Sequence, residues 1–331
     1  MNLNLTNTSR NNASLLNFTI TNQNNTDNVT NSHLDDMWYF SIGILILYIV
    51  VISVGMSGNV LALRVLFKEN TKTKQTQVFL LKTLAITDLM FLISVTLTHP
   101  AMIGDNDKNL NKHYGNFAIV TRLFGSAVGA LTLWMVVLVT VDRYIRIEKP
   151  LQAPIICNIK RMKKVVGVLT IASIIFTIPR VLFAYDRNTF NTIAKKRQYW
   201  FINEVILKSL FIYIGPVITV SILNVKLIQS IRRFQHNVQQ LTDGRKDRKQ
   251  ILTMIAIMSV FTLSSIVCAV YNSLIGLALC GIIDVSIEVS EISFQIAQFI
   301  FICNISCNFL FYFLFGKKFK RESKKILLCK N

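Results

Sequence analysis

The amino-acid sequence predicts an all-α membrane protein, a bundle of seven transmembrane helices followed by a short amphipathic helix. Three observations predict this fold class. Of the 331 residues, 52% are hydrophobic and 16% are charged, whereas soluble domains carry about 25% charged residues. Seven apolar runs approach the roughly 20 residues that a membrane-spanning helix requires. Lys and Arg, which give a net charge of +19, gather in alternate connections between these runs.

The composition and motifs exclude several other classes of protein. The four histidines lie far apart, and the chain contains no HExxH, GxGxxG or GxxxxGK[ST] motif. The six cysteines form no CxxC pair, so a zinc site or a redox motif is not indicated. Because the positive charge lies between apolar runs, it is typical of a membrane protein and not of a nucleic-acid binder. We therefore expect no catalysis and no nucleic-acid partner.

Residues 1–37 form a polar segment rich in Asn and Thr, without the apolar core of a signal peptide. We expect this segment to be extracellular, disordered and glycosylated. Its six N-x-[ST] sequons begin at Asn4, Asn7, Asn12, Asn17, Asn24 and Asn28.

The seven predicted spans follow within residues 38–315. Their approximate bounds are 39–67, 77–103, 115–143, 165–184, 205–231, 250–280 and 287–315. The fourth span is the weakest, because its uncharged part ends just before Arg180. The fifth contains Lys208 and Pro216, which a helix inside a bundle tolerates.

The distribution of Lys and Arg predicts the orientation. With the N-terminus outside, the cytoplasmic connections and tail hold 24 basic residues and the exterior segments hold 7. Cytoplasmic loops carry this excess in membrane proteins. We therefore expect a multi-pass protein of the plasma membrane with an extracellular N-terminus.

Residues 316–331 are expected to form the cytoplasmic amphipathic helix and tail. Apolar residues such as Phe319, Ile326 and Leu327 alternate there with Lys and Arg. This pattern predicts a helix that lies on an anionic inner leaflet and contacts its lipids. Cys329 is a candidate for palmitoylation, and an unmodified cysteine is the alternative.

Polar residues within the spans indicate where function resides, because an ionisable group in a membrane is costly. Asp88 lies in the second span, and Asn304 and Asn308 share one face of the seventh. Asp142-Arg143-Tyr144 directly follows the uncharged part of the third span, at its inner end.

At these residues the chain resembles a rhodopsin-like (class A) G-protein-coupled receptor over nearly all of residues 38–329. The resemblance rests on motifs that occur in order and at matching depths. They are Gly58-Asn59-Val60, Leu84-Ala85 with Asp88, Asp142-Arg143-Tyr144, Pro216, Asn308-Phe-Leu-Phe-Tyr312 and Gly316-Lys-Lys-Phe319. The segments that begin at Ile178, Ile222 and Asn308 look most like those of invertebrate FMRFamide-type neuropeptide receptors.

The resemblance implies two sets of functional residues. Coupling to a heterotrimeric G protein would involve Asp142, Arg143, Tyr144 and Tyr312, with Arg143 paired to the adjacent Asp142 at rest. No cofactor is expected, but an allosteric sodium ion would bind Asp88, Thr132, Asn304 and Asn308. A protonated Asp88 that is hydrogen-bonded within the bundle is the alternative.

The chain also departs from the family pattern. It has Ala118 where the outer disulfide usually begins, and the tryptophan of the fourth helix is missing. The Cys-Trp-x-Pro motif of the sixth helix survives only as Cys268, and Phe309 replaces the usual proline of the seventh. These departures leave open whether signalling is retained.

The departures also restrict the ligand, because two family signatures are absent. Gly125 stands where amine receptors carry Asp, and Ile302 stands where opsins carry the retinal-bearing Lys. The acidic residues expected around the outer cavity would suit the arginine of an amidated peptide. The expected ligand-binding residues are Arg122, Gly125, Arg180, Glu204, Glu288 and Glu291.

The sequence therefore predicts a G-protein-coupled receptor for an extracellular ligand, with an FMRFamide-like neuropeptide as the first expectation. An orphan chemosensory receptor for a small molecule is the nearest alternative. A small membrane transporter is a further one, although no inverted repeat is visible in the sequence.

Overall fold

The computed structural model describes residues 42–43, 45–68, 75–98, 110–185, 201–238 and 244–309. The chain divides into two compact units, Met1–Val50 and Val51–Asn331, and the packing described below is that of the second unit. Within the described residues, a helix occupies each of the seven predicted spans. The helices are Leu45–Lys68, α2 (Gln75–Thr98), α4 (Leu110–Glu148), α6 (Ile159–Tyr185), η2 (Phe201–Ile214) with α9 (Gly215–Val238), α10 (Gly244–Leu279) and α11 (Ile287–Cys307).

The apolar character of these helices supports a membrane protein. By length and composition, five of the described helices can cross a membrane, and Ile292–Cys307 is a shorter apolar helix. The fourth predicted span, now α6, is not among these five. The predicted helix at residues 316–331 and the segment 1–37 lie outside the described residues.

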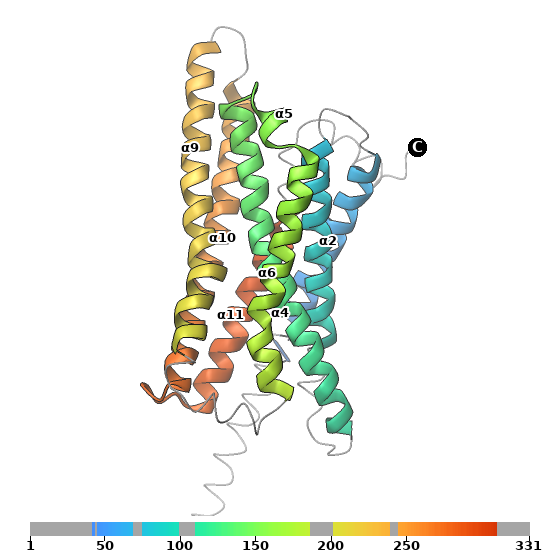
Figure 1. The fold of residues 1–331 in the computed structure, drawn as a ribbon, viewed down its shortest axis with the longest axis vertical. Helices are drawn as coiled ribbons and strands as arrows, with labels where there is room; N and C mark the ends of the chain where they lie inside the picture. Colours follow the sequence, from blue (N-terminus) through green and yellow to red (C-terminus); the bar gives the residue numbers. More distant parts are fainter. Residues whose placement is uncertain are drawn as a thin grey trace, which may run out of the picture. The chain divides into compact units, whose positions relative to one another are not determined.

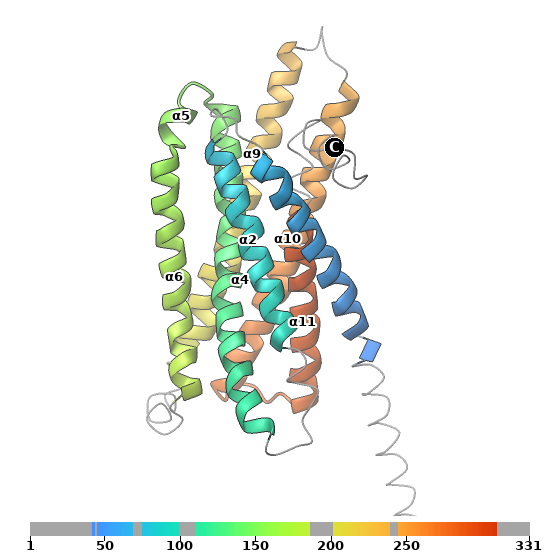
Figure 2. The ribbon, with the colours of Figure 1, turned by 90° about the vertical axis from the view of Figure 1, so that its right-hand side faces the viewer.

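The long helix α4 organises the packing of the second unit. It contacts α2, α6, η2 and α9 (Figure 1), and its contact with α2 is the most extensive between any two described elements. Figure 2 shows α6 and α11 on opposite sides of the α2 and α4 pair. A central helix with partners on several sides must be apolar around most of its circumference, as the third predicted span is.

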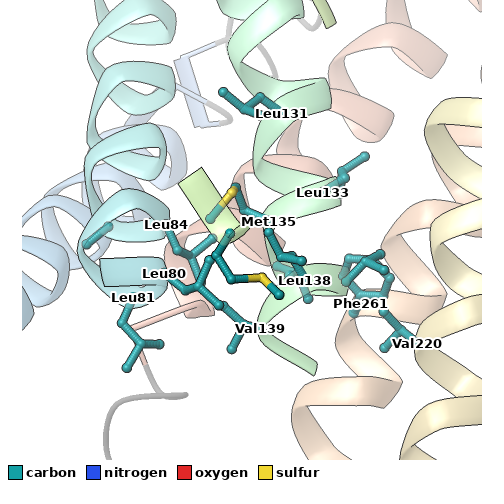
Figure 3. Close-up of a cluster of buried hydrophobic side chains, with 14 of the residues drawn as sticks. Leu80, Leu81, Leu84, Leu131, Leu133, Met135, Leu138, Val139, Val220 and Phe261 are labelled. Atoms are coloured by element: carbon teal, nitrogen blue, oxygen red, sulfur yellow. The ribbon is translucent and has the colours of Figure 1, made fainter. Parts of the chain in front are cut away.

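The core lies between the inner halves of the helices. Leu80 and Leu84 of α2 are buried with Met135 and Val139 of α4 (Figure 3). Phe261 of α10 and Val220 of α9 belong to the same cluster. Because these side chains come from four helices, the cluster holds together the segments that carry the polar residues described below.

Glycines allow two close approaches between helices. A Cβ atom at Gly125 of α4 would lie 2.5 Å from the Ser94 hydroxyl of α2. A Cβ atom at Gly55 of the first helix would lie 2.4 Å from the Ser306 hydroxyl of α11. Small residues at helix contacts are a general means of close packing in membranes.

The fifth span changes its helical geometry at its centre. The π-helix η2 covers 14 residues, although π-helices are usually single turns and occur often at functional sites. It ends where α9 begins, at Gly215 and Pro216. A Cβ atom at Gly215 would lie 2.7 Å from the carbonyl oxygen of Leu210, so glycine is required for this close approach.

Candidate functional site

The first candidate site surrounds Asp88 in the middle of α2. Its carboxylate is fully buried, and its Oδ1 accepts a hydrogen bond from Asn308 Nδ2 at 3.1 Å. The Thr132 side chain of α4 lies beside the same carboxylate. Two residues that the sequence predicted as partners of Asp88 therefore do lie against it, although they come from different helices.

Several oxygens at this depth accept no hydrogen bond from the described residues. They include Asp88 Oδ2 and Thr132 Oγ1, and also Asn59 Oδ1 and Ser306 Oγ. Asn304, on the same helix as Ser306, is buried as well. A buried carboxylate oxygen without a hydrogen-bond donor is costly. Of these oxygens, those of Asp88 and Thr132 belong to neighbouring side chains and are hard ligands that suit a small cation. A proton on Asp88 would reduce the same cost.

The second candidate site lies at the C-terminal end of α4. Asp142 is 2% exposed, and both of its carboxylate oxygens accept hydrogen bonds from Arg146, at 2.8 and 3.1 Å. The sequence led us to expect the adjacent Arg143 as its partner. Residues four apart lie on the same face of a helix, which explains why Arg146 makes this ion pair. Asp142 also acts electrostatically on the adjacent Arg143.

The turn after α4 packs against this ion pair. The short helix α5 (Ala153–Ile156) is followed by Cys157, whose carbonyl oxygen accepts a hydrogen bond from Thr76 Oγ1 of α2 at 2.9 Å. The Cys157 thiol is near Asp142, and burial together with that negative charge raises the pKa of Cys157 to about 11. Asp142 is thus covered by the turn, which α2 binds through Thr76.

Two apolar side chains of this turn point away from the core. Leu151 is 92% exposed and Ile155 is 70% exposed. The turn is basic at its start, where Lys149 precedes Pro150. Exposed apolar residues in a basic connection at the end of the helices are available for contact with a partner or with lipid.

The third candidate site lies toward the other ends of the helices. Arg122 of α4 is exposed, and its guanidinium carbon lies 5.8 Å from the centre of the Phe294 ring of α11. Gly125 is buried one turn further along α4, against Ser94. These two expected ligand residues therefore border α11 and α2, respectively.

A polar network joins η2 to α10 near this site. Lys208 Nζ donates a hydrogen bond to Asn272 Oδ1, and Asn272 Nδ2 donates to Tyr213 OH at 3.2 Å and to the Cys268 carbonyl at 2.7 Å. The Cys268 thiol donates to the Ala297 carbonyl of α11 at 3.6 Å. The sequence analysis did not identify Asn272, although an amide within an uncharged span was a signal for it.

The remaining predicted site residues are not described at the level of their side chains. Arg180 lies in α6, Glu204 in η2, and Glu288 and Glu291 in α11, but their side chains lie outside the described part of the structure. Tyr312, expected to take part in G-protein coupling, also lies outside the described residues, as do Cys329 and the six sequons. Tyr144 itself is half-buried on α4.

Comparison with known proteins identifies the class. Residues 58–312 match the 7 transmembrane receptor (rhodopsin family) domain, and this match covers most of the chain. The protein therefore belongs to the rhodopsin family of seven-transmembrane receptors, which are receptors and not enzymes, and it is an integral multi-pass membrane protein with the seven-helix fold. Family members act through an extracellular ligand and a G protein.

Individual relatives are similar to this chain at low identity. The FMRFamide receptor of Drosophila melanogaster is 28% identical over 60% of this chain and 37% of its own length. The sex peptide receptor-related protein 2 of Caenorhabditis elegans is 22% identical over 60% of this chain and 51% of its own length. The rat somatostatin receptor type 1 is 24% identical over 85% of this chain and 70% of its own length.

The match thus spans less than two thirds of the first two relatives. All three have names that refer to peptides, whereas a scallop Gq-coupled rhodopsin is 23% identical over 63% of this chain.

Proposed function

We propose that this protein is a plasma-membrane receptor, with its N-terminus outside, that binds an FMRFamide-like neuropeptide and activates a heterotrimeric G protein. The observation that carries the proposal is the inner end of α4, where Arg143 follows the buried Asp142 in a family whose members act through G proteins. The similarity to receptors for FMRFamide and somatostatin supports a peptide ligand.

The geometry at Gly125 supports the same class of ligand. An amine receptor needs a carboxylate at this position, but here even a Cβ atom would lie 2.5 Å from the Ser94 hydroxyl. An aspartate at position 125 would therefore have to displace the Ser94 hydroxyl. A peptide is recognised through several separated contacts, so its binding does not depend on an aspartate at position 125.

The exposed turn after α4 supports coupling to a protein partner. Leu151 protrudes from a basic connection beside the Asp142–Arg146 pair. An apolar anchor that is surrounded by positive charge suits a partner with an apolar pocket and an acidic rim. In this proposal that partner is the G protein.

The proposal is tested by screening amidated peptides on cells that express the receptor, with calcium and cyclic-AMP readouts. One peptide should produce a response that Arg143→Ala abolishes at equal surface expression. The matched control is Arg233→Ala, an exposed arginine of α9, which should respond like the wild type. An Arg143→Ala receptor with an unchanged response would refute the role of Arg143, and no response to any peptide would refute the ligand class.

We further propose that Asp88, Thr132, Asn304 and Asn308 hold a sodium ion that favours the resting receptor. Support comes from the buried oxygens at Asp88 and Thr132 that accept no hydrogen bond from the described residues. A ligand that binds one state better shifts the receptor toward that state. Sodium should therefore lower agonist affinity.

Thermal unfolding tests this ion site without an agonist. Replacing choline chloride with sodium chloride at constant ionic strength should raise the unfolding temperature of the wild type and leave that of Asp88→Asn unchanged. An equal shift in both proteins would instead support the alternative, a protonated Asp88 that holds no ion.

A further inference from the structure

A stripe of exposed side chains runs along the outer face of α6 and changes character near its start. Residues 160, 164, 168, 171, 175 and 178 follow the three- and four-residue spacing of one helical face. Val168 and Ile171 are 65% and 60% exposed, and Ile175 and Ile178 continue this apolar face. Lys160 and Lys164, also exposed, begin it. The face therefore changes from basic to apolar within one turn.

In a protein that spans a bilayer, this change locates the membrane surface on α6. The apolar part from Val168 to Ile178 extends about 15 Å at 1.5 Å per residue, which matches the depth of one hydrocarbon leaflet. Lys160 and Lys164 then lie at the level of the phosphates, where lysines near a helix end extend toward the headgroups.

Further lysines approach the same position from the α2 side. Lys163 Nζ lies 5.9 Å from the centre of the Phe79 ring of α2. Lys82, one turn beyond Phe79 on α2, places its Nζ 4.2 Å from the centre of the exposed Phe67 ring. We name Lys82, Lys160, Lys163 and Lys164 the α2–α6 basic surface. The hydrogen bond from Thr76 to the Cys157 carbonyl ties the starts of these two helices together.

The chain segment that carries Lys160, Lys163 and Lys164 contains no acidic residue that could neutralise their charge. No Asp or Glu occurs between Glu148 and Asp186, and the first turn of α6 contains no acidic residue. Glu148 itself accepts a hydrogen bond from Ser230 of α9, on a different helix. The three exposed lysines at the start of α6, Lys160, Lys163 and Lys164, therefore favour a partner with several negative charges.

We propose that the α2–α6 basic surface binds the headgroup of a polyphosphorylated inositol lipid. The phosphates of the lipid contact Lys160, Lys163 and Lys164, and its acyl chains lie along Val168 and Ile171. A headgroup with several phosphates matches the charge of this surface better than a headgroup with one net negative charge. The proposal rests on the proposed function only in assigning this end of the helices to the inner leaflet.

Lipid binding to the purified full-length receptor tests this proposal. The receptor is placed in phosphatidylcholine nanodiscs that carry a fluorescent phosphatidylinositol bisphosphate in both leaflets, so neither orientation nor signalling affects the result. The triple variant Lys160→Gln/Lys163→Gln/Lys164→Gln should bind this lipid roughly tenfold less tightly or worse, given the effect of each lysine near an anionic surface. The control variant Lys226→Gln/Arg232→Gln/Arg233→Gln removes three exposed charges of α9 and should bind like the wild type.

Three other results would overturn the proposal. An equal loss in both triple variants would show general attraction to the protein's positive charge. Equal competition by phosphatidylserine at the same total charge would show that the surface does not select a headgroup. Full competition by soluble inositol trisphosphate at the concentration of the lipid would show a site for a free phosphate compound and not for a lipid.

Discussion

At the scale of single residues, the partner of Asp142 has the clearest energetic consequence. The carboxylate is buried, and its two hydrogen bonds to Arg146 are charge-assisted. Arg146 remains partly exposed, with 20% of its side chain accessible. If Arg146 is removed, the buried carboxylate has lost two donors, and this is more costly than the loss of a surface ion pair.

We therefore predict that Arg146→Gln lowers the free energy of unfolding by about 1.5–3 kcal/mol, the range for hydrogen bonds to charged groups. The measurement is SDS-induced unfolding of the purified receptor in mixed micelles. A double-mutant cycle with Asp142→Asn should show a coupling of the same order, because each single substitution removes the same pair. Strictly additive effects would contradict the pairing.

A second prediction concerns the reactivity of Cys157 as a function of pH. The thiolate is the reactive form, and burial raises the pKa of Cys157 from 9.0 to about 11. At pH 8 the folded receptor should therefore react with iodoacetamide at Cys157 about a hundredfold more slowly than the unfolded chain. Mass spectrometry of the peptide that contains Cys157 gives both rates.

The sign of the accompanying stability change follows from the same shift. Because the folded pKa of Cys157 lies above the unfolded value, its contribution to stability is fully present below pH 9 and is lost between pH 9 and about 11. In the Cys157→Ser variant, the free energy of unfolding should therefore fall less between pH 9 and about 11 than it does in the wild type. Equal alkylation rates in the folded and unfolded protein at pH 8 would show that the thiol is not shielded.

At the scale of elements, the fifth span depends on one glycine. In the Gly215→Ala variant, the added methyl group would meet the backbone carbonyl of Leu210 at 2.7 Å, and a backbone atom cannot rotate away as the end of a side chain can. We predict that Gly215→Ala lowers the free energy of unfolding by about 1–3 kcal/mol, as overpacking does.

Gly167 of α6 provides the matched control. No atom lies within 4 Å of a Cβ at Gly167, so Gly167→Ala should leave the stability unchanged or raise it by up to about 1 kcal/mol through helix propensity. Unfolding in SDS micelles compares the two variants directly. If both alanine variants have the same stability, the contact at Leu210 does not constrain the junction of η2 and α9.

The positions of the elements were predictable, and many contacts between them were not. Hydropathy located all seven helices because membrane spans have a simple compositional signature. The family motifs predicted that Asn308 lies near Asp88, but as an oxygen ligand of an ion and not as the hydrogen-bond donor that it is in the structure. The bonds of Lys208 and Asn272, and the approach of Cys157 to Asp142, join residues far apart in sequence that carry no motif. For Asp142, the motif pointed to Arg143, and the helical spacing, which the sequence analysis did not use, indicates Arg146 as a further partner.

At the scale of the whole molecule, the distribution of basic residues makes a prediction about topology. The 24 basic residues on one side and 7 on the other should place the N-terminus outside the cell. An antibody to an N-terminal epitope tag should therefore label intact cells, whereas a tag inserted at residues 239–243 should be labelled only after permeabilisation.

The sequons provide an independent test of the same topology. Digestion with peptide N-glycosidase should reduce the apparent mass of the wild type and have no effect on a variant with Gln at Asn4, Asn7, Asn12, Asn17, Asn24 and Asn28, since glycans are added only on the exterior side. Labelling of the N-terminal tag only after permeabilisation, together with an unchanged mass on digestion, would reverse the predicted orientation.

The contact between Gly125 and Ser94 also restricts how this receptor can evolve. A lineage that acquired an acidic residue at position 125 in a single step would first encounter a clash between α2 and α4. Descendants that keep this packing must turn the Ser94 hydroxyl aside or lose it before position 125 can grow. Among orthologous sequences, an acidic residue at position 125 should therefore be accompanied by a change at position 94, whereas sequences that keep Ser94 should keep a small residue at position 125.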